Sequence, residues 1–181
     1  VTGGPGRRAV LLGGALLLPA GCATAPERFD GRGPPFAPEQ FFSGRLRSHG
    51  MFTDRLGTIR EWFTAELEGS WDGTVLRFAE VFTYDDGWVD RRQWELWRDG
   101  PGHWRGTATD AVEEVTAAEH GNAFHLLHTL DMPRPGGGTR RLRFDQWFVR
   151  VGPNEALSRA AVSWRGLVQV GTAQVAFRRL D

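Results

Sequence analysis

The sequence has no lysine, a single cysteine and no excess of either charge. Its 22 positive side chains are therefore all arginine, and they are balanced by 22 aspartate and glutamate residues. Without lysine, Schiff-base chemistry and the lysine of a phosphate-binding loop are excluded. One cysteine excludes a disulfide scaffold and a cysteine-based zinc site. Zero formal net charge argues against nucleic-acid binding, which needs a basic face to neutralise phosphates.

The motifs of the common hydrolases are also missing. There is no Gly-x-Ser-x-Gly elbow, no His-Glu-x-x-His and no glycine-rich loop that leads into a helix. Glu113 and Glu114 are adjacent, and His125 and His128 are three residues apart, so on strands each pair points to opposite faces. Neither pair is then able to act as a catalytic dyad or a metal site. We therefore expect no enzymatic activity, no cofactor and no bound metal.

Apolar and aromatic residues are present in quantity. Hydrophobic residues make up 40% of the chain, with eight tryptophans and 12 phenylalanines among them. This composition excludes wholesale disorder. A chain of 181 residues is long enough for one hydrophobic core and a tail, and too short for two cores of ordinary size.

The first 21 residues have the pattern of a lipoprotein signal peptide. Arg7 and Arg8 precede an apolar run from Ala9 to Ala20, which is too short to span a bilayer as a helix. The run leads into Leu18-Pro19-Ala20-Gly21-Cys22, which places the cysteine where a lipoprotein signal peptidase would leave it. We expect residues 1–21 to be removed and Cys22 to carry a lipid that holds the protein on a membrane.

Two alternatives stay open at this end of the chain. Pro19 occupies a position where a lipobox usually has an aliphatic residue, and an ordinary signal peptidase could cut after Ala25, although Pro26 follows. The pair Arg7-Arg8 also resembles a twin-arginine signal, which implies folding before export. We expect the protein on the periplasmic side of the bacterial envelope. An aspartate directly after the lipidated cysteine would favour retention at the inner membrane. This chain has Ala23 there, so we expect the anchor at the outer membrane.

Residues 23–38 are rich in proline, glycine and charge and have no periodic pattern. Such a composition is typical of a tether. We therefore expect residues 22–38 to form the lipidated cysteine and a tether, and residues 39–181 to form the folded domain. Residues 38–43 are expected to make one short turn that covers an end of this domain.

Turn-forming sequences recur at near-regular intervals through the rest of the chain. Examples are Asp54-Arg55-Leu56-Gly57, Asp85-Asp86-Gly87 and Gly152-Pro153-Asn154. The stretches between them alternate in polarity, which predicts about ten short strands joined by hairpins. Such a sheet has two unpaired edges unless it closes on itself. The predicted fold is all-β, a single up-and-down antiparallel barrel of lipocalin-like form, which holds either packed side chains or one small ligand.

One hairpin can be aligned residue by residue. A three-residue loop, Asp85-Asp86-Gly87, makes Tyr84 face Trp88. Counting back from this loop, Glu80 lies opposite Arg92, so a carboxylate and a guanidinium are expected to meet inside the barrel. The same inward face carries the aromatic residues Phe78, Phe82 and Trp94.

The residues expected to line a ligand site are Phe78, Glu80, Phe82, Arg92, Trp94, His128 and Asp145. In the functional interpretation, Arg92 binds the carboxylate or phosphate of a small amphiphile among the aromatic side chains. In the structural interpretation, Glu80 and Arg92 form a buried ion pair that fixes the strand register. His128 could equally be a core histidine, and solvent exposure is the default for Asp145 and for two other charged strand residues, Asp110 and Arg159.

Several short motifs, in this order and spacing, resemble the bacterial lipoproteins of the domain-of-unknown-function family DUF3833. They are Phe42-Ser43-Gly44, the stretches 50–57, 69–73 and 80–87, Arg92-Gln93-Trp94, Gly121-Asn122-Ala123 and Phe144-Asp145-Gln146-Trp147. The resemblance runs from about Phe41 to Arg178 and implies a lipid-anchored envelope protein with a lipocalin-like barrel. It implies no known activity. The chain departs from the family pattern at Gln146, where an aspartate is usual, and at Ala111-Val112-Glu113, which is poorer in glycine.

Two functions are consistent with these observations. The first is binding or shuttling of a small amphiphile, such as a fatty acid or a lysolipid, beside the membrane that holds the anchor. The second is an envelope scaffold with a filled barrel, which would bind an unknown protein partner through exposed aromatic residues such as Trp62, Trp97 or Trp164. The two differ in the volume of the interior, because a ligand site needs several hundred Å³ of connected space.

Overall fold

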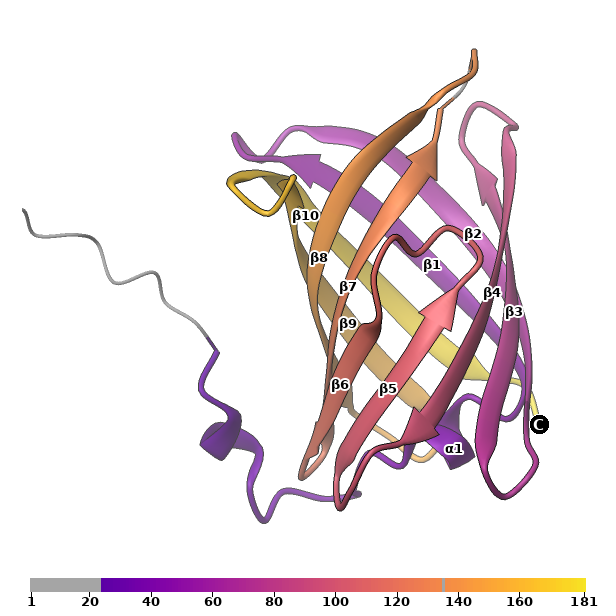
Figure 1. The fold of residues 1–181 in the computed structure, drawn as a ribbon, viewed down its shortest axis with the longest axis vertical. Coiled ribbons are helices and arrows are strands. Elements are labelled where there is room, and N and C mark those ends of the chain that lie inside the picture. Colours follow the sequence, from indigo (N-terminus) through magenta and orange to yellow (C-terminus); the bar gives the residue numbers. More distant parts are fainter. Residues whose placement is uncertain (1–23, 135) are drawn as a thin grey trace, which may run out of the picture.

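The computed structural model describes residues 24–134 and 136–181, and they form a closed antiparallel barrel of ten strands (Figure 1). The strands are β1 (Gly44–Asp54), β2 (Ile59–Trp71), β3 (Val75–Tyr84), β4 (Val89–Arg98), β5 (His103–Ala108), β6 (Val115–His120), β7 (Ala123–Pro133), β8 (Thr139–Arg150), β9 (Glu155–Trp164) and β10 (Val168–Arg179). Each strand pairs with its neighbours in sequence, and β1 pairs with β10 to close the ring. The predicted up-and-down barrel is confirmed.

Alternating polarity determines which face of each strand points inward. In β4, Arg92, Trp94 and Leu96 are buried, while the alternate residues Arg91, Gln93 and Glu95 are exposed. This period of two is the natural repeat of an extended chain, since successive side chains lie on opposite faces of a sheet. The barrel interior therefore collects every second residue of each strand.

The predicted β3–β4 hairpin is confirmed in its register. Tyr84 and Trp88 close the turn through a hydrogen bond from the Tyr84 amide to the Trp88 carbonyl, at 2.9 Å. Gly87 has a φ of 84°, which a residue with a side chain rarely adopts. Glu80 consequently pairs with Arg92 across the ladder, and Phe78 pairs with Trp94.

One end of the barrel is closed by the segment before β1. A short helix, α1 (Pro38–Phe41), lies at the lower end in Figure 1 and confirms the predicted short turn. Phe36, Phe41 and Phe42 are buried and form part of the hydrophobic core. Gly69 in β2 allows the close approach of this segment, because a Cβ at that position would collide with the carbonyl oxygen of Phe42.

The folded unit begins earlier than the predicted boundary at residue 39. Phe36 is only 1% exposed, and its amide donates to the Gly121 carbonyl at 2.9 Å. Further upstream, Phe29 ends the 3₁₀ helix η1 (Pro26–Phe29) and stacks on Trp147 with a ring-centroid distance of 5.2 Å. The tether prediction was wrong for this part of the segment because two aromatic side chains dock an otherwise polar stretch onto the barrel.

The predicted signal peptide and Cys22 lie outside the described residues. Within residues 24–134 and 136–181, no helix has the length and apolar character needed to cross a bilayer.

Candidate functional site

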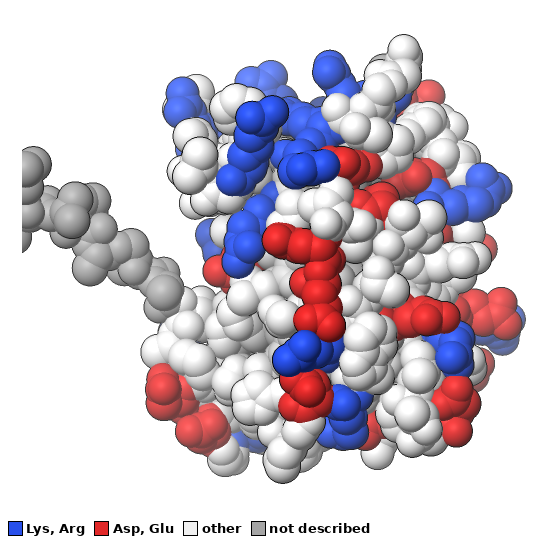
Figure 2. Space-filling view, in the orientation of Figure 1, with Lys and Arg blue, Asp and Glu red and all other residues white. Residues whose placement is uncertain are grey.

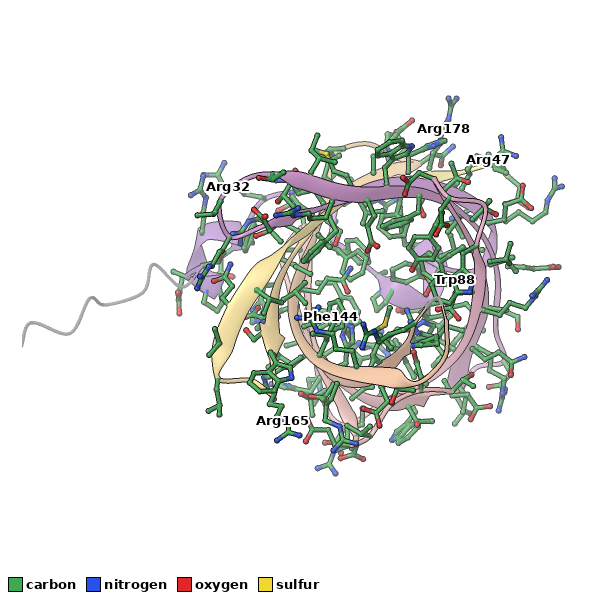
Figure 3. The ribbon with its side chains drawn as sticks, turned by 90° about the horizontal axis from the view of Figure 1, so that it is seen from above. Arg32, Arg47, Trp88, Phe144, Arg165 and Arg178 are labelled. Atoms are coloured by element: carbon green, nitrogen blue, oxygen red, sulfur yellow. The ribbon has the colours of Figure 1, made fainter. Side chains whose placement is uncertain are left out.

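The barrel encloses a cavity of about 800 Å³. Figure 3 looks along the barrel from the end opposite α1 and shows the ring of strands around the interior side chains. Phenylalanine rings line the inner part of the cavity, namely Phe42, Phe78, Phe124, Phe148 and Phe177. Charged residues of the opposite end of the barrel line its outer part, among them Asp54, Arg60, Glu61, Arg134 and Arg140. The cavity is thus an apolar chamber whose charged end faces away from α1.

Arginines gather around this end of the barrel (Figure 2). Arg134, Arg140, Arg141 and Arg165 line a shallow groove there with Trp164. Of these, Arg141 is paired with Asp131, with Nη2 at 2.8 Å from Oδ2.

The structure places six of the seven predicted site residues on the cavity wall. These are Phe78, Glu80, Phe82, Arg92, Trp94 and His128. They come from three strands. Phe78, Glu80 and Phe82 lie on β3, Arg92 and Trp94 lie on β4, and His128 lies on β7.

Asp145, the seventh predicted residue, lies on the outer face, and its inclusion was wrong. Its side chain is 54% exposed, and its Oδ1 atom lies 2.8 Å from Nε2 of His125. Phe144 and Gln146, its neighbours in β8, line the cavity instead. Alternation requires this arrangement, since the residue between two inward side chains points outward.

Gln146, where the chain departs from the family pattern, is therefore an inward residue. Its Nε2 atom donates a hydrogen bond to Oγ of Ser158 on β9 at 2.8 Å. Arg159, a possible inward residue in the sequence, is exposed on the outer face of β9.

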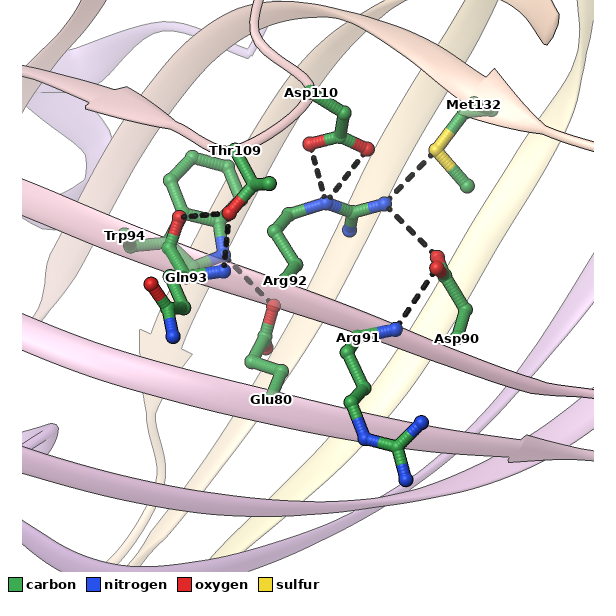
Figure 4. Close-up of polar contacts among 9 residues, drawn as sticks. All are labelled: Glu80, Asp90, Arg91, Arg92, Gln93, Trp94, Thr109, Asp110 and Met132. Carbon is green, nitrogen blue, oxygen red and sulfur yellow. Dashed lines mark hydrogen bonds and ion pairs between the residues drawn. The ribbon is translucent and has the colours of Figure 1, made fainter.

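The predicted ion pair between Glu80 and Arg92 does not form, although the two residues are paired in register. Arg92 instead directs its Nε atom at Asp110, at 2.8 Å from Oδ1 and 3.0 Å from Oδ2 (Figure 4). Its Nη2 atom lies 3.0 Å from Sδ of Met132 and 3.6 Å from Oδ2 of Asp90. The guanidinium is thus held by two carboxylates, those of Asp110 and Asp90.

Glu80 has a different partner. The indole Nε1 of Trp94 donates to Oε2 of Glu80 at 2.8 Å. Burial raises the pKa of the Glu80 carboxyl, and the nearby charge of Arg92 opposes this shift without cancelling it. Burial would lower the pKa of Arg92, but the hydrogen bond and the charge of Asp110 outweigh it, so the pKa of Arg92 is raised.

His128 completes the polar part of the wall. It is 4% exposed, stacks on Phe144 at 4.9 Å and meets the edge of Trp94 at 5.2 Å. Its Nδ1 atom is buried and has no hydrogen-bond partner among the described residues. Burial, reinforced by the charge of Arg92, lowers the pKa of His128 to about 3, so the imidazole is neutral at pH 7.

We expect the neutral His128 to make the barrel less stable as the pH falls. The unfolded chain takes up a proton near the ordinary histidine pKa of 6.5, whereas the folded chain does so only near about 3, so folded stability is lost across this interval. Between about pH 7 and about pH 5 the loss should be about 2 kcal/mol. Glu80 acts in the opposite sense, since its raised pKa favours the folded state as the pH falls.

Urea unfolding of E80Q and of the double variant E80Q/H128F at these two pH values separates the two groups. The E80Q variant should retain the His128-dependent loss, and the double variant should lack it. Equal pH dependence of the two variants would contradict a histidine that is kept neutral by burial.

His125 and His128 point to opposite faces of β7, as predicted. His125 stacks on Trp147 at 4.1 Å on the outside, whereas His128 lines the cavity. Across the described part of the chain, no group of three or more histidine, cysteine, aspartate or glutamate side chains has an arrangement able to hold a metal ion.

A closed up-and-down barrel of ten strands, with an apolar chamber inside and a short helix over one end, defines a lipocalin-like protein. The chain belongs to the family described as "Protein of unknown function (DUF3833)", whose model matches residues 16–179. The resemblance found in the sequence motifs is confirmed. No curated protein sequence matches the chain.

The solved structures that resemble the barrel include two natural proteins. The S-type phycobiliprotein lyase CPES from Guillardia theta is 13% identical with a TM-score of 0.59, and the match covers 86% of this chain and 97% of that one. A DUF3598-family protein of unknown function from Nostoc punctiforme is 11% identical with a TM-score of 0.51, over 81% of this chain and half of that one. At such identities the likeness establishes the fold alone.

Proposed function

We propose that this protein binds a small, mainly apolar or amphiphilic molecule inside its barrel. The observation that carries the proposal is the cavity of about 800 Å³, which falls within the range of roughly 300–1,000 Å³ found for ligand pockets. An apolar lining with a few converging polar groups is the usual composition of such pockets. Fatty acids and lysolipids, expected from the sequence, are the first compounds to test.

The cavity also weighs against the alternative of a scaffold with a filled barrel. Trp62 and Trp164 are exposed on the outer surface, in keeping with that alternative, and Trp97 is half-buried. The scaffold also requires a filled interior, whereas the structure has a cavity. Exposed aromatic residues that occur singly need no partner to explain them.

Binding rather than catalysis is supported by how the polar wall residues are held. Trp94 occupies one oxygen of Glu80, and Asp110 holds Arg92. We further propose that Cys22 is lipidated and anchors the protein on the periplasmic side of the envelope, at the outer membrane. Such an anchor would keep the cavity close to a source of amphiphiles.

Filling the cavity should abolish this function without unfolding the barrel. Ala173 in β10 lines the cavity, and Ala176 in the same strand is exposed on the outer face. We expect A173W to weaken ligand binding at least tenfold, because the indole occupies ligand space, and A176W to bind as the wild type does. Isothermal titration calorimetry with decanol, decanoate and a short-chain lysophosphatidylcholine measures the difference.

Native mass spectrometry of protein from a lipid-rich host is the companion measurement. The wild type should retain a small molecule that delipidation removes, and A173W should not. A wild type that is recovered empty and binds none of the three compounds would count against the proposed function.

A further inference from the structure

The partners of the buried Arg92 guanidinium determine which ligand head groups the polar part of the cavity wall is able to bind. Arg92 is the buried cation that the sequence offered as an anchor for an anionic ligand, and it is 7% exposed. Its Nε atom is bonded to both oxygens of Asp110, and its Nη2 atom faces Asp90. A ligand carboxylate would have to compete with these two built-in carboxylates for the same charge.

The balance of charge around Arg92 also disfavours an anionic head group. Three carboxyl groups, those of Glu80, Asp90 and Asp110, act on this single guanidinium. The cluster therefore has more acidic than basic groups, and a further anion placed against it would be repelled in surroundings of low dielectric constant. A cation or a neutral head would meet no such penalty.

Two hydrogen-bond acceptors on the wall remain open to a ligand, one on Glu80 and one on His128. Trp94 engages only Oε2 of Glu80, and no described residue bonds to Oε1. A neutral imidazole has one acceptor nitrogen, and no described residue bonds to either ring nitrogen of His128. Both side chains line the same cavity. A buried polar atom without a partner costs free energy, so a ligand that satisfies it gains affinity.

We propose that the cavity takes an apolar molecule whose polar head donates hydrogen bonds, as an alcohol or an amine does, and that it discriminates against a carboxylate head. Glu80 and His128 receive the hydrogen bonds, and the phenylalanine rings of the inner chamber surround the apolar part. This inference rests on the proposed function and specifies the ligand class for the same cavity.

The arginines at the opposite end of the barrel from α1 do not reverse this preference. Arg60 donates from Nε to Oδ2 of Asp54 at 2.8 Å, so its charge is paired. Arg134 and Arg140 are exposed, and an ion pair formed there is screened by salt and contributes little. A carboxylate bound at this end would also leave the acceptors on the wall unsatisfied.

A matched series of ligands tests the inference. Decylamine, decanol and decanoate have the same alkyl chain and differ only in the head group, so calorimetry on the full chain at physiological ionic strength isolates the head. We expect decylamine and decanol to bind at least tenfold more tightly than decanoate. Decanoate binding as tightly as decanol, or more tightly, would overturn the inference and leave the proposed function standing. Failure of all three to bind would overturn the inference. The proposed function would fall with it if the lysophosphatidylcholine also failed to bind and the protein was recovered empty.

Two variants, H128F and E80Q, test whether the head-group preference originates in the cavity wall. H128F keeps an aromatic ring against Phe144 but removes an acceptor, and it should weaken decanol binding by about tenfold. H125F, on the outer face of the same strand, is the matched control and should bind as the wild type does. E80Q should weaken decylamine binding more than decanol binding, because it removes a group able to carry the opposite charge. If H128F and H125F bind decanol equally, His128 is not part of the head-group site and the inference is wrong.

Discussion

Replacing Phe36 with alanine is expected to destabilise the barrel by about 3–5 kcal/mol, the usual cost of removing a buried phenylalanine side chain. Phe36 is 1% exposed and packs against the rings of Phe41, Phe42, Phe124 and Phe148, with centroid distances of 5.0, 5.9, 5.7 and 6.1 Å. Truncation would therefore leave a void among four aromatic side chains, at the end of the barrel that α1 closes. Equilibrium unfolding in urea measures the change.

The control is an aromatic side chain of the same barrel that lies at the surface. Trp62 is 59% exposed on β2, and W62A should change the free energy of unfolding by no more than about 0.5 kcal/mol. A loss for F36A as small as that for W62A would show that the segment before α1 contributes nothing to the core. In that case the folded unit would begin near residue 39, as its composition indicated.

The parts of the fold that were predicted correctly depend on local sequence. Turn residues recur at short intervals, and alternation between them gives each strand an inner and an outer face. The β3–β4 register followed from the length of one turn. A three-residue loop allows the two strands to pair in only one register, and this register places Glu80 opposite Arg92. Closure of the ring followed from the number of strands and the cost of open edges.

Asp145 is a residue for which charge and alternation give opposite predictions. Phe144 and Phe148 are inward residues of β8, so a residue one position after Phe144 has to point outward. The charge of Asp145 favours a site residue, whereas the pattern of its neighbours excludes an inward position. The position of Asp110 could not be predicted in this way, because it lies in the turn after β5, where alternation no longer applies.

The partner of Arg92 could not be predicted from the register alone. Backbone pairing brings Cα atoms together, but a long side chain chooses among all the groups within its reach. Asp110 follows β5, 18 residues after Arg92, and it offers two oxygens to the Nε atom. The docking of Phe29 and Phe36 is equally non-local, because it depends on surfaces that exist only once the barrel has closed.

The engagement of Arg92 by Asp110 leads to the prediction with the largest expected effect on binding. The variant D110N keeps an oxygen that can accept from Nε but removes one of the two negative charges that hold the guanidinium. Arg92 then becomes available to a ligand anion. We expect decanoate to bind about 10- to 100-fold more tightly than it binds the wild type, corresponding to about 1.4–2.7 kcal/mol, in the range of a charged hydrogen bond. Decylamine should bind more weakly.

The same variant should show a dependence of stability on the ligand. Without ligand, D110N should unfold more easily than the wild type, because a buried charge has lost one of its two ion-pair partners. Decanoate should restore part of this loss, since a molecule that binds only the folded state stabilises it by mass action. The control is D145N, an aspartate-to-asparagine change on the outer face, which should alter neither stability nor head-group preference by much. If D110N leaves decanoate binding unchanged, Asp110 is not what keeps a carboxylate from Arg92, and the selectivity of the cavity has to originate elsewhere on its wall.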